Sequence, residues 1–175
     1  MNLVTDVWLP CKFKDGSVKE IAIAEIANPD VIDLALPRAD FQGAAYQLLI
    51  GLLQTVMAPE NRKEWHRLYN NPPTPEELQE QLNKVAHAFN VTGDGPLFMQ
   101  DFGPLEEAKA TEISGLFIDA PGDKTIKDNK DHFVKRGVIE DLSLPMAALA
   151  LFTLQINAPS GGQGHRVGLR GGGPL

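Results

Sequence analysis

Two apolar stretches, residues 44–58 and 142–156, most constrain what this chain can fold into. Each is shorter than the roughly 20 apolar residues that a membrane-spanning helix needs. Apolar residues crowd every face when either stretch is drawn as a helix, which is typical of a helix buried in a globular core. We therefore expect core helices over residues 39–58, ending before Pro59, and over residues 143–157.

Local start signals predict the remaining helices. The run Thr74–Glu77 combines a capping hydroxyl, a proline at the first helical position and a glutamate that can complete a capping box. This helix is expected to continue to about Phe89. A short amphipathic helix is expected over residues 60–69, and Asp40 is the expected N-cap of the helix over residues 39–58.

The amino-terminal part of the chain predicts a β-hairpin. The apolar runs Trp8–Phe13 and Val18–Ile23 flank Asp15-Gly16, a dipeptide that suits a tight turn. Because Pro10 has no backbone N–H to donate, we expect the first strand to be an edge strand or to contain a bulge.

The central and later parts of the chain carry weaker signals. Residues 97–100 and 116–118 are expected to be short strands, and the polar residues 125–137 a loop. The fold class expected from all these elements is α+β, mostly helical with short β-strands and long loops. The 175 residues fit a single domain, 1–175.

The charge of the chain is divided unevenly. The formal net charge is −7, which excludes a globally basic nucleic-acid coat protein. Residues 1–123 carry 9 basic and 19 acidic groups, whereas residues 124–175 carry 7 basic and 4 acidic groups. We therefore expect an acidic body with two flexible basic segments, one around residues 124–136 and one in the carboxyl-terminal tail.

No arrangement of residues predicts an active site. The four histidines are isolated, no serine lies in a GxSxG elbow, and the acid pairs begin predicted helices. The single Cys11 excludes a disulfide framework and a thiolate zinc site. We expect no enzymatic activity, no cofactor and no metal. The start of the chain lacks a secretory signal, which favours a cytoplasmic protein without a membrane anchor.

The glycine-rich run over residues 161–173 is the least ordinary feature of the sequence. No Gly-Lys-Ser/Thr follows it, so it is not a phosphate loop, and its spacing only approaches a dinucleotide fingerprint. Glycine allows a backbone to approach another surface closely, and Arg166 and Arg170 add positive charge. A flexible linker and a nucleotide- or phosphate-binding loop both remain open as alternatives.

Several motifs in register resemble the CasA family, the large subunit of the type I-E CRISPR Cascade complex. The opening residues 1–10, MNLVTDVWLP, look like the start of that family, and the chain closes on a similar glycine loop followed by GLRGG at residues 168–172. Between them, the matching segments are LPRAD at 36–40, PPT at 72–74, PLFMQ at 96–100 and SGLF at 114–117. The resemblance therefore covers nearly the whole chain.

The resemblance implies a non-enzymatic subunit of an RNA-guided surveillance complex. Such a subunit recognises the protospacer-adjacent motif in target double-stranded DNA and helps load the target. The implied partners are the other Cascade subunits, the guide RNA, the target DNA and a helicase-nuclease recruited by the complex. Members of this family have a larger N-terminal domain and a C-terminal four-helix bundle, so the chain is expected to be an N-terminal fragment without the bundle.

The resemblance also implies two sets of site residues. The family's glycine loop faces the minor groove of the motif, and it corresponds here to Ser160, Gly161, Gly162, Gln163 and Gly164, with Arg166 beside it. The family's mobile loop contacts the region of the guide-RNA handle and the motif. That loop begins after Phe117 and spans about residues 119–136, and its candidate contact residues are Phe117, Lys124, Lys127 and Lys130.

Overall fold

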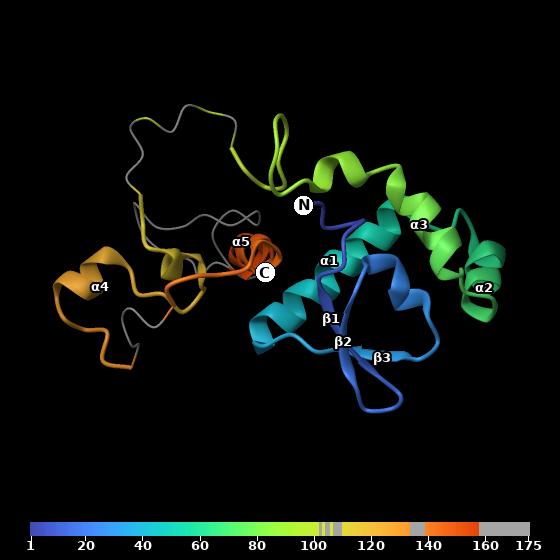
Figure 1. Ribbon diagram of the computed structural model, residues 1–175, viewed down its shortest axis with the longest axis horizontal. Helices are drawn as coiled ribbons and strands as arrows, with labels where there is room; N and C mark the ends of the chain where they lie inside the picture. Colours follow the sequence, from blue (N-terminus) through green and yellow to red (C-terminus); the bar gives the residue numbers. More distant parts are fainter. Residues whose placement is uncertain (102, 104–105, 107–109, 134–138, 158–175) are drawn as a thin grey trace. The chain divides into compact units, whose positions relative to one another are not determined.

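The computed structural model describes residues 1–101, 103, 106, 110–133 and 139–157. The chain divides into two compact units, Met1–Gln100 and Asp101–Leu175 (Figure 1). That the whole chain is one domain stays a prediction.

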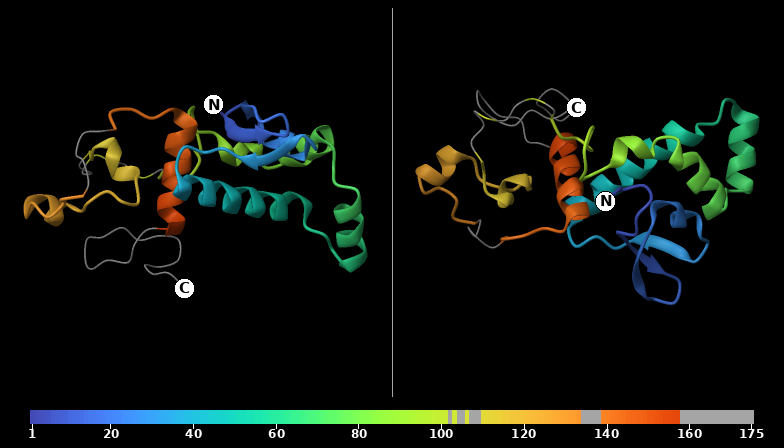
Figure 2. Two further views of the ribbon diagram at one scale, coloured as in Figure 1. Left: turned by 90° about the horizontal axis from the view of Figure 1, so that it is seen from below. Right: turned by 45° about the horizontal axis from the view of Figure 1, so that its top comes forward.

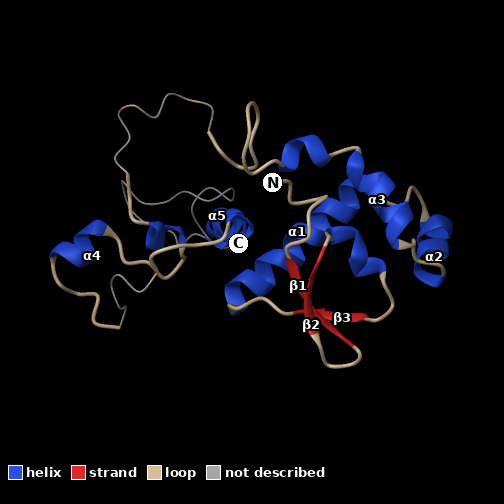
Figure 3. Ribbon diagram, in the orientation of Figure 1, coloured by secondary structure: helices blue, strands red, loops and turns tan. Residues whose placement is uncertain are grey.

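A three-stranded antiparallel sheet begins unit 1, the part Met1–Gln100 (Figure 3). Strands β1 (Leu9–Phe13) and β2 (Val18–Ile21) form the predicted hairpin. Gly16 has φ of 83°, a conformation that glycine adopts readily, and the Asp15 carboxylate accepts hydrogen bonds from the backbone N–H and the hydroxyl of Ser17. The hairpin is therefore confirmed.

Strand β3 (Val31–Leu34), which the sequence analysis did not predict, changes the position of β1. The strand order is β2-β1-β3, so β1 is the central strand and the prediction of an edge strand is wrong. The proline is tolerated because it lies where the β1–β3 ladder ends. The Pro10 carbonyl accepts from the N–H of Ala35 at 2.8 Å, and no N–H is needed in return. A bulge does occur, but between Lys12 and Phe13.

The core of unit 1 is formed by this sheet and three helices. The 3₁₀ helix η1 (Ile23–Ala27) and α1 (Ala39–Met57) both pack against α3 (Pro75–Asn83). In the left view of Figure 2, α1 lies on one side of the unit, with the sheet and α3 on the other. The buried side chains of the three helices are those of Ile23, Ala24, Phe41, Ala44, Ala45, Leu48, Leu49, Leu52, Leu78 and Leu82.

Helix α1 has the predicted span, but it is not buried on every face as the sequence predicted. Only one face is buried, since Tyr46 and Ile50 on the same helix are exposed. The N-cap is Arg38 and not Asp40. Instead, the Asp40 carboxylate accepts two hydrogen bonds from the Arg38 guanidinium, each at 2.9 Å, inside the first turn.

Helix α3 starts at the predicted position, whereas α2 (Arg62–Asn70) starts two residues later than predicted, after the N-cap Asn61. The capping box of α3 is formed in both directions, with Thr74 accepting from the N–H of Glu77 and Glu77 accepting from the N–H of Thr74. However, α3 ends at Asn83, and a separate 3₁₀ helix, η2 (Ala86–Phe89), follows it.

The prediction of a strand over residues 97–100 is wrong. This segment forms a turn in which Met99 has φ of 54° and the N–H of Gln100 donates to Leu97 O. The N–H of Phe98 donates to Asn90 O at 2.7 Å, and the ring of Phe98 stacks on Phe89 with 5.4 Å between the centroids. The Gln100 side chain also donates to Val91 O at 2.9 Å. These isolated bonds and the stacked ring hold the segment, and they do not make a strand ladder.

Unit 2 contains the 3₁₀ helix η3 (Ile113–Leu116) and the helices α4 (Asp123–Lys127) and α5 (Leu144–Asn157). Helix α5 confirms the predicted core helix and packs against η3, burying Ala148, Leu149, Ala150 and Thr153. The predicted strand over residues 116–118 is wrong, because Leu116 is the last residue of η3 and Phe117 is its C-cap. The predicted loop over residues 125–137 is partly wrong, because α4 overlaps its first residues. Taken together, the elements confirm the α+β fold class.

Candidate nucleic-acid interface

Helix α4 presents the first two lysines predicted to contact nucleic acid. It begins after Gly122, and both Lys124 and Lys127 lie in its last turn, where positive charge favours the helix dipole. Asn129, with φ of 53°, ends the helical path, and the N–H of Lys130 then turns back to donate to Thr125 O at 2.9 Å. The turn keeps all three lysines within a short segment of chain.

The three lysines lie on the surface, but their charges are not equally available. Lys130 forms an ion pair with Asp128, with 3.0 Å between Nζ and Oδ2. Within the described residues, neither Lys124 nor Lys127 forms an ion pair, and both side chains are exposed. The two ammonium groups of α4 are therefore the cations of this segment that are available to bind phosphate.

Two apolar side chains accompany these lysines, and the sequence analysis missed both. Ile126 on α4 is exposed, and Phe133 is fully exposed to solvent. The signal that could have found them is the presence of isolated large apolar residues in an otherwise polar stretch without helical period. We call the exposed cationic and large apolar side chains of residues 124–133 the basic loop surface: Lys124, Ile126, Lys127, Lys130 and Phe133.

Phe117 lies apart from this surface. Its side chain is only 4% exposed, and it follows directly after η3. Its N–H donates to Ser114 O, and its carbonyl accepts from the N–H of Ala120. Phe117 therefore belongs to the interior of unit 2, whereas the three lysines lie on the surface of the same unit.

The predicted glycine-loop residues lie outside the described residues. These are Ser160, Gly161, Gly162, Gln163, Gly164 and Arg166. The same is true of the glycine run that would form the alternative nucleotide- or phosphate-binding loop. The roles of all these residues stay predictions.

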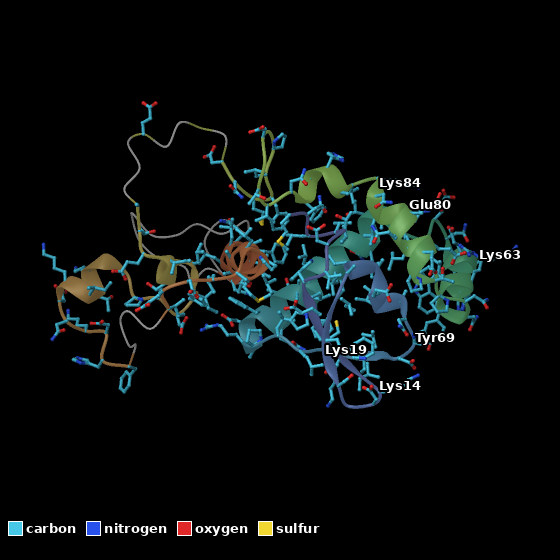
Figure 4. All side chains as sticks on the ribbon, viewed as in Figure 1. Lys14, Lys19, Lys63, Tyr69, Glu80 and Lys84 are labelled. Atoms are coloured by element: carbon cyan, nitrogen blue, oxygen red, sulfur yellow. The ribbon has the colours of Figure 1, made fainter. Side chains whose placement is uncertain are left out.

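Elsewhere, unit 1 has an open depression of about 420 Å³ between η1 and α3. The charged residues that line it, Glu25, Glu76 and Glu80, are all acidic (Figure 4 labels Glu80). Like charges would repel a phosphate, so this depression does not suit a nucleotide. Among the described residues, no group of three or more His, Cys, Asp or Glu side chains could hold a metal ion. The helices that the structure describes include none that could cross a membrane.

Comparison with solved structures shows that the fold is a known one. Cse1 from Thermobifida fusca is 22% identical, with a TM-score of 0.73 over 92% of this chain and 30% of that chain. CasA (Cse1) from Thermus thermophilus is 19% identical, with a TM-score of 0.68 over 92% of this chain and 31% of that chain. A chain of a CRISPR RNA-guided surveillance complex in a pre-nicking state is 14% identical, with a TM-score of 0.64 over 92% of this chain and 34% of that chain.

The chain thus spans about a third of the length of the solved proteins that it matches. A family model described as CRISPR-associated protein Cse1 matches residues 2–175, which is nearly the whole chain. This match confirms the resemblance that the motifs predicted. The chain belongs to the CRISPR-associated protein Cse1 family.

Proposed function

We propose that this chain forms part of a non-enzymatic subunit of an RNA-guided CRISPR surveillance complex. The subunit recognises the protospacer-adjacent motif of target double-stranded DNA and helps load the target. Membership of the Cse1 family supports this proposal, as does the fold shared with a chain of a surveillance complex. Its partners are the other Cascade subunits, the guide RNA, the target DNA and a helicase-nuclease, and it works in the cytoplasm.

The observation that carries the proposal is the exposure of Lys124 and Lys127 on α4, without ion-pair partners among the described residues. The 175-residue chain has a net charge of −7, so its nonspecific attraction to nucleic acid is weak. A small basic surface on an acidic protein favours contacts that form only where the rest of the complex positions the nucleic acid. Phe133 adds an exposed ring that can stack on a base.

The test of the basic loop surface is charge reversal in the full-length protein, assembled with its partner subunits and guide RNA. The variant replaces Lys124, Lys127 and Lys130 with glutamate, and target binding is measured at several salt concentrations. Each phosphate contact that is lost should reduce the slope of log K against log salt by about 0.9, so weaker binding and a shallower slope are expected. Unchanged affinity and slope would contradict the assignment. A matched control reverses Lys12, Lys14 and Lys19 on the hairpin, which changes the net charge equally.

A second test addresses the glycine loop. Replacing Gly161, Gly162 and Gly164 with aspartate adds bulk and negative charge to the segment proposed to face the minor groove. We expect the difference in affinity between a target with the motif and one without it to collapse. The control places aspartate at Gly171, Gly172 and Gly173 in the same tail. If the triple variant at 161, 162 and 164 still distinguishes the two targets as well as the control does, the glycine-loop role is wrong.

A further inference from the structure

Helix α2 is the least embedded helix of unit 1. No residue of α2 is buried, and α2 makes no extensive packing contact with another named element of the described chain. Local bonds hold it instead: the Asn61 side chain accepts from the N–H of Glu64, and the Glu64 carboxylate accepts from the N–H of Glu60. Changes to its outer face should therefore leave the core of the unit intact.

The outer face of α2 carries a continuous polar and aromatic stripe. Arg62, Trp65, His66 and Tyr69 occupy positions i, i+3, i+4 and i+7, which lie on one side of a helix. All four side chains are exposed, Trp65 to 50% and Tyr69 to 73%. This exposure is unusual for large aromatic side chains and marks an interaction surface. We call these four residues the α2 stripe.

The aromatic rings of the α2 stripe already form a stack. The rings of Trp65 and Tyr69 lie 13° from parallel with 5.3 Å between their centroids, and the His66 ring meets Trp65 edge-on at 5.2 Å. Because Tyr69 is mostly exposed, a flat ligand ring can extend this stack from the solvent side. Stacking on aromatic side chains is the usual way in which proteins hold unpaired nucleobases.

Positive charge surrounds the same rings. Arg62 and Lys63 form no ion pair within the part of the chain that the structure describes, whereas Arg67 lies 3.7 Å from Glu64. Unit 1 has 8 basic and 13 acidic residues, and 3 of those 8 cations lie on this one helix. Figure 4 shows Lys63 pointing away from the ribbon of α2. The net positive charge of α2 therefore complements a polyanion; the hairpin carries as many cations, Lys12, Lys14 and Lys19, and provides the charge-matched control.

The α2 stripe does not suit a partner helix with an aliphatic face, although Trp, Tyr and Arg are also common at protein interfaces. The stripe has no aliphatic side chain, and Leu68, the one aliphatic residue of α2, is half-buried on another side of the helix. A partner helix with an apolar face would find no aliphatic surface to pack against. We propose that the α2 stripe, flanked by Lys63 and Arg67, binds single-stranded nucleic acid: a base stacks on Tyr69 and Trp65, and the cations hold the adjoining phosphates.

This site is separate from the basic loop surface and does not rest on the proposed function. The basic loop surface belongs to unit 2, whereas α2 belongs to unit 1. Duplex DNA is a poor ligand for the stripe, because its bases are already stacked on each other. Single-stranded DNA and single-stranded RNA share the required chemistry, and separate titrations distinguish them.

The test uses the fluorescence of the whole 175-residue chain, which contains two tryptophans. Trp8 is 2% exposed and donates its indole N–H to Leu3 O, so a change on adding ligand reports on Trp65. The chain is titrated with a 15-nucleotide oligothymidine, a 15-nucleotide oligouridine and a duplex at equal phosphate concentration. We expect saturable quenching by at least one single strand and much weaker quenching by the duplex. The variant Trp65→Phe should abolish the signal, which verifies the reporter.

Two variants test the two halves of the proposed contact. Tyr69→Ala should weaken binding about tenfold or more, because a base loses its stacking surface. Arg62→Glu with Lys63→Glu should weaken binding and reduce its salt dependence. The control, Lys14→Glu with Lys19→Glu, makes the same charge change on the hairpin and should preserve the affinity. Circular dichroism checks that each variant remains folded.

Several results would overturn the proposal. These are the absence of saturable quenching, equal binding of duplex and single strand, or wild-type affinity in the two α2 variants. Trp65 becoming buried only when protein subunits assemble would instead assign the stripe to a protein. Reversing Lys124, Lys127 and Lys130 should leave the Trp65 signal unchanged, so failure of the basic loop surface and failure of the α2 stripe are distinguishable. If that variant lost the signal, the two surfaces would not be independent.

Discussion

Asn2 and Asn90 join the two ends of unit 1. The Asn2 Nδ2 donates to Asn90 Oδ1 at 2.9 Å, and the two residues form an antiparallel β-bridge although they are 88 positions apart in the chain. The same amide donates to Ala86 O at 2.6 Å, and its oxygen accepts from the N–H of Val4 at 2.9 Å. One side chain near the start of the chain thus ties the first residues to the segment that follows α3.

We expect Asn2→Ala to lower the free energy of unfolding by about 1–3 kcal/mol. The substitution leaves the carbonyl of Ala86 and the N–H of Val4 without their partner in a partly buried position. Chemical denaturation followed by the fluorescence of buried Trp8 measures the change. Asn70→Ala, at the exposed end of α2, is the matched control. Equal free energies of unfolding in the two variants would show that the hydrogen bonds of Asn2 make no net contribution to stability.

The capping box of α3 should contribute about 1 kcal/mol. Thr74→Ala and Glu77→Ala each remove one of two reciprocal bonds, so their effects on stability should be less than additive in the double variant. A double-mutant cycle measured by chemical denaturation gives the coupling. Glu76→Ala, which removes an acid from the same turn but no capping bond, provides the control. Strict additivity of Thr74→Ala and Glu77→Ala would contradict the reciprocal cap.

Leucine truncations should separate the core of unit 1 from its periphery. Leu82→Ala removes a side chain of α3 that is 0% exposed, and we expect a loss of about 2–5 kcal/mol from lost burial and the cavity left behind. Leu68→Ala on α2 removes the same atoms from a half-buried position and should cost well under half as much. Thermal or chemical denaturation compares the two variants directly. A comparable loss in both would mean that α2 is more firmly packed than its contacts indicate.

Cys11 on β1 should make stability depend on alkaline pH. Burial raises the pKa of its thiol from 9.0 to about 11, and the negative charge of Asp33 adds to this effect. The folded state therefore holds the proton more tightly than the unfolded state does. The resulting stabilisation is complete below pH 9 and is lost as pH rises to about 11; it amounts to about 2 kcal/mol.

The measurement for Cys11 compares unfolding free energies at pH 8 and at pH 10.5, in the wild type and in Cys11→Ala. The variant is expected to be less stable at pH 8, because it leaves space in the core, but to lose less stability than the wild type as pH rises. The comparison removes the contribution of lysines and tyrosines that titrate in the same range. Parallel pH dependence in the two proteins would refute the effect.

Elements that depend on a few neighbouring residues could be predicted from the sequence. The hairpin follows from Asp15-Gly16, and the start of α3 follows from Thr74–Glu77. The predicted strands over residues 97–100 and 116–118 failed for a shared reason. A strand needs a partner with free backbone groups, and a short apolar run carries no information about whether one will be adjacent.

The candidate sites show the same division. The lysines of the basic loop surface were evident in the sequence as a charge pattern. The sequence did not indicate that Phe117 is buried and Phe133 fully exposed. The stripe on α2 was missed because its aromatic residues suggest an ordinary amphipathic helix. An amphipathic pattern predicts that one face will be covered, and only the arrangement of the neighbouring elements determines which one.

The sequence by itself determined the hairpin, the spans of α1 and α5, the start of α3, the division of charge and, through its motifs, the family. Each of these depends on residues close together in the chain or on the chemical identity of single residues. Tertiary structure alone decided that β1 is the central strand, because β3 comes from a segment without a strong signal of its own. It also decided which aromatic rings remain exposed, since burial depends on elements distant in the sequence that compete for the same core.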